Sequence, residues 1–493
     1  MSDRHPDGFL RHPRRPLDYR DPAERIQDYR EVYAADWDPD PLRAQGERCM
    51  DCGTPTCMAG CPIGNLIPEW NDLVSSGCWR EALERLHATN NFPEFTGYTC
   101  PAPCEPACTL AVSDAPVTIK NIERAIVDMG WQQGWIRPEP PARRSGFTVA
   151  VVGSGPAGLA CAQQLNRAGH TVVVFERDDT IGGLMTYGIP DFKFDKRRVA
   201  RRVDQLAQEG IAFRTGIEVG RELSLAELRE RFDAVCLAIG ARTPRTVEIP
   251  GRTLGGVELA MEFLTAENRR QAGVAVPRPV TARGLDVVIL GGGDTGADCL
   301  ATAHRHGARS ATQVSIRDRP PEWRDAHHPW PWLPMTYAST YALEEGGRDV
   351  YGLNALAFLD EDGDGRVDAI LAERVAWDYD AGGRRRDKRV LETALRIPAQ
   401  LVLIAVGFSG PRLDGLAGSG LALTPDSALA RGADLMTALP GVFAAGDAAM
   451  GQSIVVWAIG EGRDAARAID RYLTGDSRLP ASLRTTNPPL RTR

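Results

Sequence analysis

The chain has 493 residues, 43% of them hydrophobic, and a formal net charge of −7. This length predicts about three domains, since single domains usually hold ~100–200 residues. The acidic balance excludes the strongly basic nucleic-acid-binding proteins, so we expect no nucleic-acid partner. The polar start lacks the apolar run of a signal peptide, and no apolar stretch approaches the ~20 residues of a membrane-spanning helix. We therefore expect a cytoplasmic protein with no membrane partner.

Two cysteine groups dominate residues 1–145, where apolar residues recur at helical spacing. Thiolates at such spacing bind zinc or iron–sulfur clusters, and zinc sites usually show two C-x2-C pairs, whereas this region has one. We favour iron–sulfur over zinc and predict a helical domain that holds the clusters. A [4Fe–4S] cluster takes four ligands, so the second group needs one from elsewhere. The two groups are Cys49, Cys52, Cys57 and Cys61, then Cys100, Cys104 and Cys108.

A proline-rich linker at 137–146 precedes a β-branched run that leads into a first G-x-G-x-x-G turn. Backbone amides in such a turn approach a dinucleotide pyrophosphate at the start of the following helix. The next strand, 171–175, ends at Glu176, where a carboxylate can accept hydrogen bonds from an adenosine ribose. The turn contains Gly153, Gly155, Pro156, Ala157 and Gly158.

The strand, turn and helix pattern repeats at 285–296, which predicts a second nucleotide site. The strand after it, 311–316, ends without an acidic residue and runs into Arg317 and Arg319. Arginine there can pair with a 2′-phosphate, which favours NADPH over NADH; the alternative is a solvated charged loop. The second turn contains Gly291, Gly293, Asp294, Thr295 and Gly296.

A short apolar strand near 441–445 ends at Gly446 and Asp447, like the turn by which flavoproteins close on the flavin. The FAD domain is therefore expected to be discontinuous. We predict an α/β fold with a helical iron–sulfur domain (1–145), a first FAD-binding segment (146–250), an NAD(P)H domain (251–410), and a second FAD-binding segment with a C-terminal tail (411–493). Hydride transfer needs orientation rather than a proton donor, so no catalytic acid or base is predicted. Cys161, Cys236 and Cys299 are expected to be buried.

In their order, these motifs resemble the small (beta) subunit of glutamate synthase over nearly the whole chain. The resemblance also includes 116–123, 446–462 and the segment 182–190 with Gly183 and Leu184. It implies a flavin iron–sulfur oxidoreductase that passes electrons from NAD(P)H through FAD and two [4Fe–4S] clusters to a large (alpha) subunit, which makes glutamate from glutamine and 2-oxoglutarate. The alternative is a stand-alone NAD(P)H:acceptor oxidoreductase that feeds ferredoxin or another flavoprotein.

The related N-terminal region of dihydropyrimidine dehydrogenase implies that the two cysteine groups exchange ligands. One cluster would bind Cys49, Cys52, Cys57 and Cys108. The other would bind Cys61, Cys100, Cys104 and a non-cysteine ligand, for which Glu123 occupies the matching position. The alternative is that Glu123 is a surface glutamate near a helix start.

Overall fold

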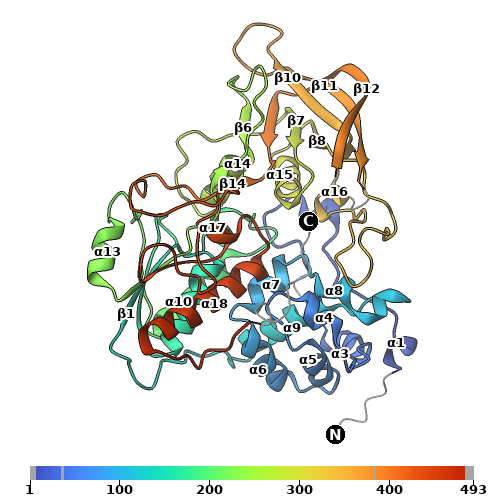
Figure 1. Ribbon diagram of the computed structural model, residues 1–493. Helices are drawn as coiled ribbons and strands as arrows, with labels where there is room; N and C mark the ends of the chain where they lie inside the picture. The colour runs from blue at the N-terminus through green and yellow to red at the C-terminus, as the bar shows by residue number, and fades with distance from the viewer. Residues whose placement is uncertain (1–6, 35–37, 381–384, 483–493) are drawn as a thin grey trace.

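The described residues, 7–34, 38–380 and 385–482, form a helical N-terminal region and two five-stranded parallel sheets in this computed structural model (Figure 1). This architecture confirms the predicted α/β fold class. The expected C-terminal tail lies outside the described residues beyond 482.

The N-terminal region is built from short helices around an apolar core. The longest, α9, buries Ile119, Ile122 and Ile126 along one face, as expected for an amphipathic helix. Helices α3, α5, α6 and α7 all pack against it. The elements are α1 (Gly8–Arg11), α2 (Pro22–Arg25), α3 (Pro39–Glu47), α4 (Thr56–Gly60), α5 (Ile67–Ser75), α6 (Trp79–Thr89), α7 (Pro93–Thr99), α8 (Cys104–Ala107), η1 (Thr109–Val112) and α9 (Ile119–Gln132).

The first sheet has the strand order β15-β4-β1-β2-β3, and all its neighbours are parallel. Its central strand β1 is buried along most of its length, because helices cover both faces of a parallel sheet. The strands are β1 (Thr148–Val152), β2 (Thr171–Phe175), β3 (Ala212–Arg214), β4 (Ala234–Leu237) and β15 (Val442–Ala444). The predicted return of the C-terminal segment to this sheet is therefore confirmed by β15.

Two helices far apart in the sequence, α10 and α18, pack side by side on this sheet (Figure 1). Gly462 makes this contact close, because a Cβ there would lie 2.1 Å from the carbonyl oxygen of Ala157. The helices of this region are α10 (Pro156–Arg167), α11 (Leu184–Tyr187), α12 (Lys196–Gln208), α13 (Leu225–Arg231), α17 (Asp447–Met450) and α18 (Val455–Thr474).

The second sheet has the order β6-β13-β7-β8-β9 and is also parallel. Its strands are β6 (Val257–Leu259), β7 (Asp286–Leu290), β8 (Ser310–Ser315), β9 (Arg348–Tyr351) and β13 (Leu401–Ile404). Its helices are α14 (Ala260–Gln271), α15 (Asp294–Arg305) and α16 (Tyr341–Glu344).

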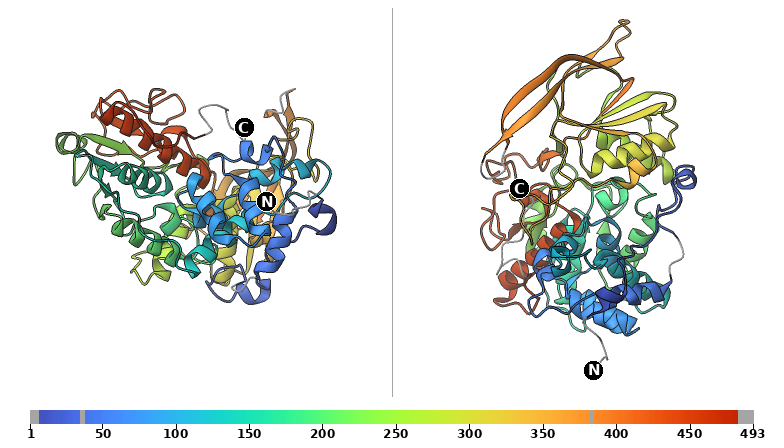
Figure 2. Two further views of the ribbon diagram at one scale, coloured as in Figure 1. Left: turned by 90° about the horizontal axis from the view of Figure 1, so that it is seen from below. Right: turned by 90° about the vertical axis from the view of Figure 1, so that its right-hand side faces the viewer.

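A three-stranded antiparallel sheet, β10-β11-β12, was not predicted from the sequence. Its strands are β10 (Leu353–Leu359), β11 (Ala369–Tyr379) and β12 (Arg385–Pro398). Figure 2 shows this sheet at the end of the molecule away from the N-terminal helices.

The chain crosses between the two parallel sheets through a short antiparallel pair, β5 (Thr243–Pro244) and β14 (Phe408–Gly410). These crossings lie close to the predicted domain limits at 250 and 410. We keep the four predicted ranges as a proposed division of the chain.

Candidate functional site

Cys49, Cys52 and Cys57 of the first cysteine group lie near Cys108 of the second, which follows α8, and we call these four the first ligand set. Helices α4 and α8 are in contact, which brings the two stretches of the sequence together. Burial raises the pKa of the Cys57 thiol, and the nearby thiols of Cys49 and Cys108 raise it further. All eleven cysteines are free. Four neighbouring thiols form a ligand set that fits an iron–sulfur cluster.

A small pocket is lined by Cys61, Cys100, Cys104 and Glu123, which we call the second ligand set, with Val456 from the first turn of α18. Burial raises the pKa of Cys61 to about 11, and the nearby carboxylate of Glu123 also raises it. Glu123 is only 6% exposed, and burial raises its pKa to about 7. The structure thus places Glu123 in the pocket rather than on the surface. Three sulfurs and one carboxylate fit a cluster with a single oxygen ligand.

The first glycine turn follows β1 at the carboxyl end of the first sheet. Gly153 has φ +101°, and a Cβ there would lie 2.4 Å from the Ala238 carbonyl oxygen. A Cβ on Gly158 would lie 1.9 Å from the Gly153 carbonyl oxygen. Gly155, in contrast, has no atom within 4 Å of where its Cβ would stand. The outer glycines therefore serve close packing, and the middle one faces open space suited to a pyrophosphate.

Glu176 stands at the end of β2 and is almost fully buried. Its Oε2 accepts hydrogen bonds from the amide and the hydroxyl of Ser154, at 3.0 and 2.6 Å. Its Oε1 accepts one from the Asp178 amide at 2.9 Å. The carboxylate therefore fixes the conformation of the glycine turn. Sequence reasoning gave Glu176 only a ribose contact and missed Ser154.

Two later segments close over this turn. The Gly182 amide donates to the Ser154 hydroxyl at 3.0 Å, and a Cβ on Gly183 would lie 2.9 Å from Gly155 Cα. Leu184, the next residue, is 48% exposed. From the other side, a Cβ on Gly446 would lie 2.7 Å from the Ala157 Cβ. The structure thus brings the segment of Gly183 and that of Gly446 to the start of α10.

Asp447 begins α17 directly after Gly446. Burial raises the pKa of its carboxyl to about 6, while hydrogen bonds from Ser453 lower it. A buried polar group of this kind at the edge of a nucleotide fold is suited to hold a ligand hydroxyl.

The second glycine turn repeats the first. A Cβ on Gly291 would lie 2.2 Å from the Ala405 carbonyl oxygen, and one on Gly296 would lie 2.4 Å from the Gly291 carbonyl oxygen. The middle residue, Gly293, again has nothing within 4 Å. Asp294 and Thr295 form the first turn of α15. Each of the two turns thus has one open position, at its middle glycine.

Gln313 on β8 supports this second turn, and it was not singled out from the sequence. Its Nε2 donates to the carbonyl oxygens of Gly291 at 2.9 Å and Gly293 at 3.2 Å. Hydrophobic alternation does not single it out, because Thr312 and Gln313 are consecutive polar residues on the predicted strand.

The two arginines after β8 differ in their surroundings. Arg317 is exposed at the strand end. Arg319 pairs with Glu322 at 2.7 Å, and its guanidinium lies 3.9 Å from the centre of the Tyr337 ring. Asp318 accepts a hydrogen bond from the Tyr379 hydroxyl. Arg317 is therefore the better placed of the two to meet a phosphate, since Arg319 is already engaged.

The loop after these arginines reaches back to the first ligand set at Cys108. The Trp330 indole donates to the Cys108 carbonyl oxygen at 3.2 Å, and Arg324 donates to the Pro106 carbonyl oxygen at 3.3 Å. His328 Nδ1 in the same loop lies 2.9 Å from Asp325 Oδ1. The contact with α8 was not predicted, because nothing in the sequence pairs two distant loops.

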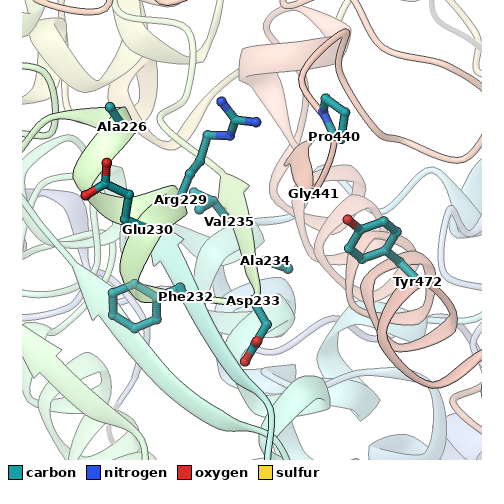
Figure 3. A pocket seen from close by; sticks show the side chains of 10 residues that line it. All are labelled: Ala226, Arg229, Glu230, Phe232, Asp233, Ala234, Val235, Pro440, Gly441 and Tyr472. Atoms are coloured by element: carbon teal, nitrogen blue, oxygen red, sulfur yellow. The ribbon is translucent and has the colours of Figure 1, made fainter.

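A surface pocket of about 400 Å³ lies between α13 and α18 (Figure 3). It is lined by Arg229, Asp233 and Tyr472, among others. Asp233 accepts a hydrogen bond from the amide of Thr148, the first residue of β1. The pocket therefore lies at the amino end of the sheet, opposite the glycine turn, and is separate from the nucleotide site.

Two sequence families match the chain. Residues 25–135 match dihydropyrimidine dehydrogenase domain II, 4Fe-4S cluster. Residues 147–328 match pyridine nucleotide-disulphide oxidoreductase. No helix among the described residues is long and apolar enough to cross a membrane.

Curated relatives match over the full length. The chain is 53% identical to the glutamate synthase [NADPH] small chain of Mycobacterium tuberculosis, over 99% of this chain and 100% of the relative. It is 46% identical to the protein of the same name from Bacillus subtilis, over 96% of this chain and 99% of that one.

Among solved structures, FprA from Mycobacterium tuberculosis in complex with NADPH is similar with a TM-score of 0.54 and 19% identity, over 67% of this chain and 85% of that one. This likeness concerns the fold alone.

Proposed function

Because this chain belongs to the family of glutamate synthase small chains, we propose that it is the electron-input subunit of glutamate synthase. It takes electrons from NADPH and passes them through FAD and iron–sulfur clusters to a large subunit that makes glutamate from glutamine and 2-oxoglutarate. FAD is the group that accepts a hydride as an electron pair and releases the electrons singly.

The single observation that carries this proposal is the presence of two glycine turns, each with an open middle position. The same chain brings two sets of cluster ligands together. Gly155 and Gly293 each leave space where a side chain would stand. The backbone there can approach a pyrophosphate, and the N-terminus of the following helix favours its negative charge. We assign the first turn to FAD, since the segments of Gly183 and Asp447 close over it, and the second to NADPH.

We propose two [4Fe–4S] clusters, one for each ligand set. Cys49, Cys52, Cys57 and Cys108 would hold the first, and Cys61, Cys100, Cys104 and Glu123 the second. The electrostatic influence of Cys49 and Cys108 on Cys57 supports the first set. The pocket shared by the other four residues supports the second. Ligation requires deprotonated thiols, so cluster binding would release protons.

The proposed partner is a glutamate synthase large subunit. We also propose a cytoplasmic location, since eleven free cysteines suit a reducing compartment. The direct test of electron entry uses the purified holoprotein and NADPH under anaerobic conditions. NADPH should bleach the flavin absorbance and support reduction of ferricyanide. A protein whose flavin stays oxidised with NADPH would contradict the proposal.

We predict that Arg317→Ala raises the KM for NADPH about 10- to 100-fold, because a charge-assisted hydrogen bond contributes ~1.5–3 kcal/mol. The KM for NADH should change little, since NADH lacks the 2′-phosphate. Arg319→Ala is the matched comparison and should have the smaller effect, because Arg319 pairs with Glu322. Steady-state kinetics with both nucleotides measure this, and equal losses for NADPH and NADH would refute the assignment of Arg317.

A further inference from the structure

Two buried side chains hold one oxygen of the Glu123 carboxylate. Oε1 accepts hydrogen bonds from Asn90 Nδ2 at 2.9 Å and from the Thr96 hydroxyl at 2.7 Å. Asn65 also hydrogen-bonds the carboxylate. Asn90, Thr96 and Glu123 are all buried. A buried carboxylate fixed this way has little freedom to rotate.

Thr96 joins two members of the second ligand set. Its hydroxyl donates to Glu123, and its carbonyl oxygen accepts the amide of Cys100 at 2.9 Å. Cys100 follows α7 directly, as its C-cap. The position of one sulfur and that of the carboxylate are thus set by the same residue.

Asn90 is fixed as firmly as Thr96. Its Nδ2 is 2.8 Å from the Thr96 hydroxyl oxygen, and its Oδ1 accepts the Phe92 amide at 3.0 Å. The next residue, Asn91, donates to Gln163 on α10 and accepts from Arg463 on α18, both at 2.7 Å. The segment that orients Glu123 is therefore anchored on the two helices that cover the first sheet.

We propose that Asn90 and Thr96 are positioning residues for the second cluster: by holding Glu123 Oε1 they would orient the carboxylate as a ligand to the cluster. The inference rests on the proposed cluster sites. Hydrogen bonds to a ligand tune its donor strength and raise the reduction potential of a cluster. Their loss should lower the potential of the second cluster and loosen the iron that Glu123 holds.

The test compares Thr96→Val with Thr96→Ser, which keeps the hydroxyl, in the holoprotein. Thr99→Val is the matched control, because the Thr99 hydroxyl bonds the Phe95 carbonyl oxygen within its own helix. The measurements are the electron paramagnetic resonance spectrum of each reduced cluster, its midpoint potential, and the rate of iron release to a chelator.

Thr96→Val should change the spectrum of one cluster, move its potential to a more negative value, and speed its iron loss about tenfold, as outer-shell changes commonly do. The other cluster and the FAD content should not change. Thr96→Ser and Thr99→Val should behave as the wild type.

Wild-type spectra and potentials in Thr96→Val would overturn the inference while leaving two clusters in place. A wild-type protein with a single cluster would instead overturn the cluster assignment itself. If Thr96→Val loses FAD and both clusters through misfolding, Asn90→Ala decides the question, since it removes the other donor to Oε1 and leaves the Thr96 hydroxyl in place. It must then affect the second cluster selectively for the proposal to stand.

Discussion

Gly155→Val should give a folded protein that purifies without FAD and no longer oxidises NADPH. The backbone at Gly155 has φ −66° and ψ 177°, an extended conformation that any residue adopts, and the new side chain meets no protein atom near its Cβ. The valine would instead fill the space of the pyrophosphate. Losing two charge-assisted hydrogen bonds of ~1.5–3 kcal/mol each weakens binding by about 100-fold or more. Flavin absorbance measures the bound FAD, and circular dichroism shows whether the variant is folded.

Gly293→Val is the reciprocal control, because Gly293 is the middle glycine of the second turn and is equally open. This variant should retain FAD, lose reduction by NADPH, and still be reduced by dithionite. If Gly155→Val kept its FAD, or if Gly293→Val lost it, the assignment of the two turns would be wrong.

Cys57→Ala should remove one iron–sulfur cluster and leave the other. Iron should fall from roughly eight to roughly four atoms per chain, because each [4Fe–4S] cluster holds four. FAD should stay bound, since the first glycine turn follows β1, whereas Cys57 lies in α4 of the N-terminal region. Ferricyanide reduction by NADPH should continue, because this acceptor can take electrons from the flavin.

Cys104→Ala should remove the other cluster. The paramagnetic signal that remains in this variant should differ from the one that remains in Cys57→Ala. Cys299→Ala is the control, since Cys299 is buried in α15 away from both groups. Identical remaining signals in the two variants would contradict the crossed ligand sets. Stoichiometric zinc in place of iron would contradict the cluster assignment altogether.

The two nucleotide folds could be predicted from the sequence because their signals are local. A β-branched strand, a glycine turn and a helix follow one another within about 20 residues in each case. The return of β15 to the first sheet was predicted from Gly446 and Asp447. Burial of Cys161, Cys236 and Cys299 was also confirmed.

The missed features depend on contacts between distant residues. The antiparallel sheet β10-β11-β12 was not predicted within the NAD(P)H domain, because β12 is charged and exposed along most of its length and lacks the apolar alternation of a half-buried strand. Ser154 occupies an x position of the G-x-G-x-x-G pattern, for which the pattern predicts no role. Its amide and hydroxyl nevertheless donate to Glu176 and fix the conformation of the turn. Asn90 lies 33 residues from Glu123, and no spacing rule connects an asparagine in a helix–helix link to a carboxylate in another helix.

Ion pairs between distant residues also hold the N-terminal region against the second sheet. Arg25 of the N-terminal region is fully buried and pairs with Glu345 at 2.8 Å, and Glu345 also pairs with Arg305 of α15 at 2.6 Å. Removing one partner of such a buried group is costly, since it leaves an uncompensated charge. These pairs fix the N-terminal region against the second sheet, and only the folded chain shows them.

The central claim is that this chain supplies electrons to glutamate synthesis performed elsewhere. The most direct measurement is NADPH-driven glutamate formation from glutamine and 2-oxoglutarate by the purified chain, with and without a matching large subunit that is active with reduced methyl viologen. The chain alone should reduce ferricyanide but form no glutamate, and the mixture should form glutamate with NADPH. Glutamate made by the chain alone, or none made from NADPH by the mixture, would contradict the account.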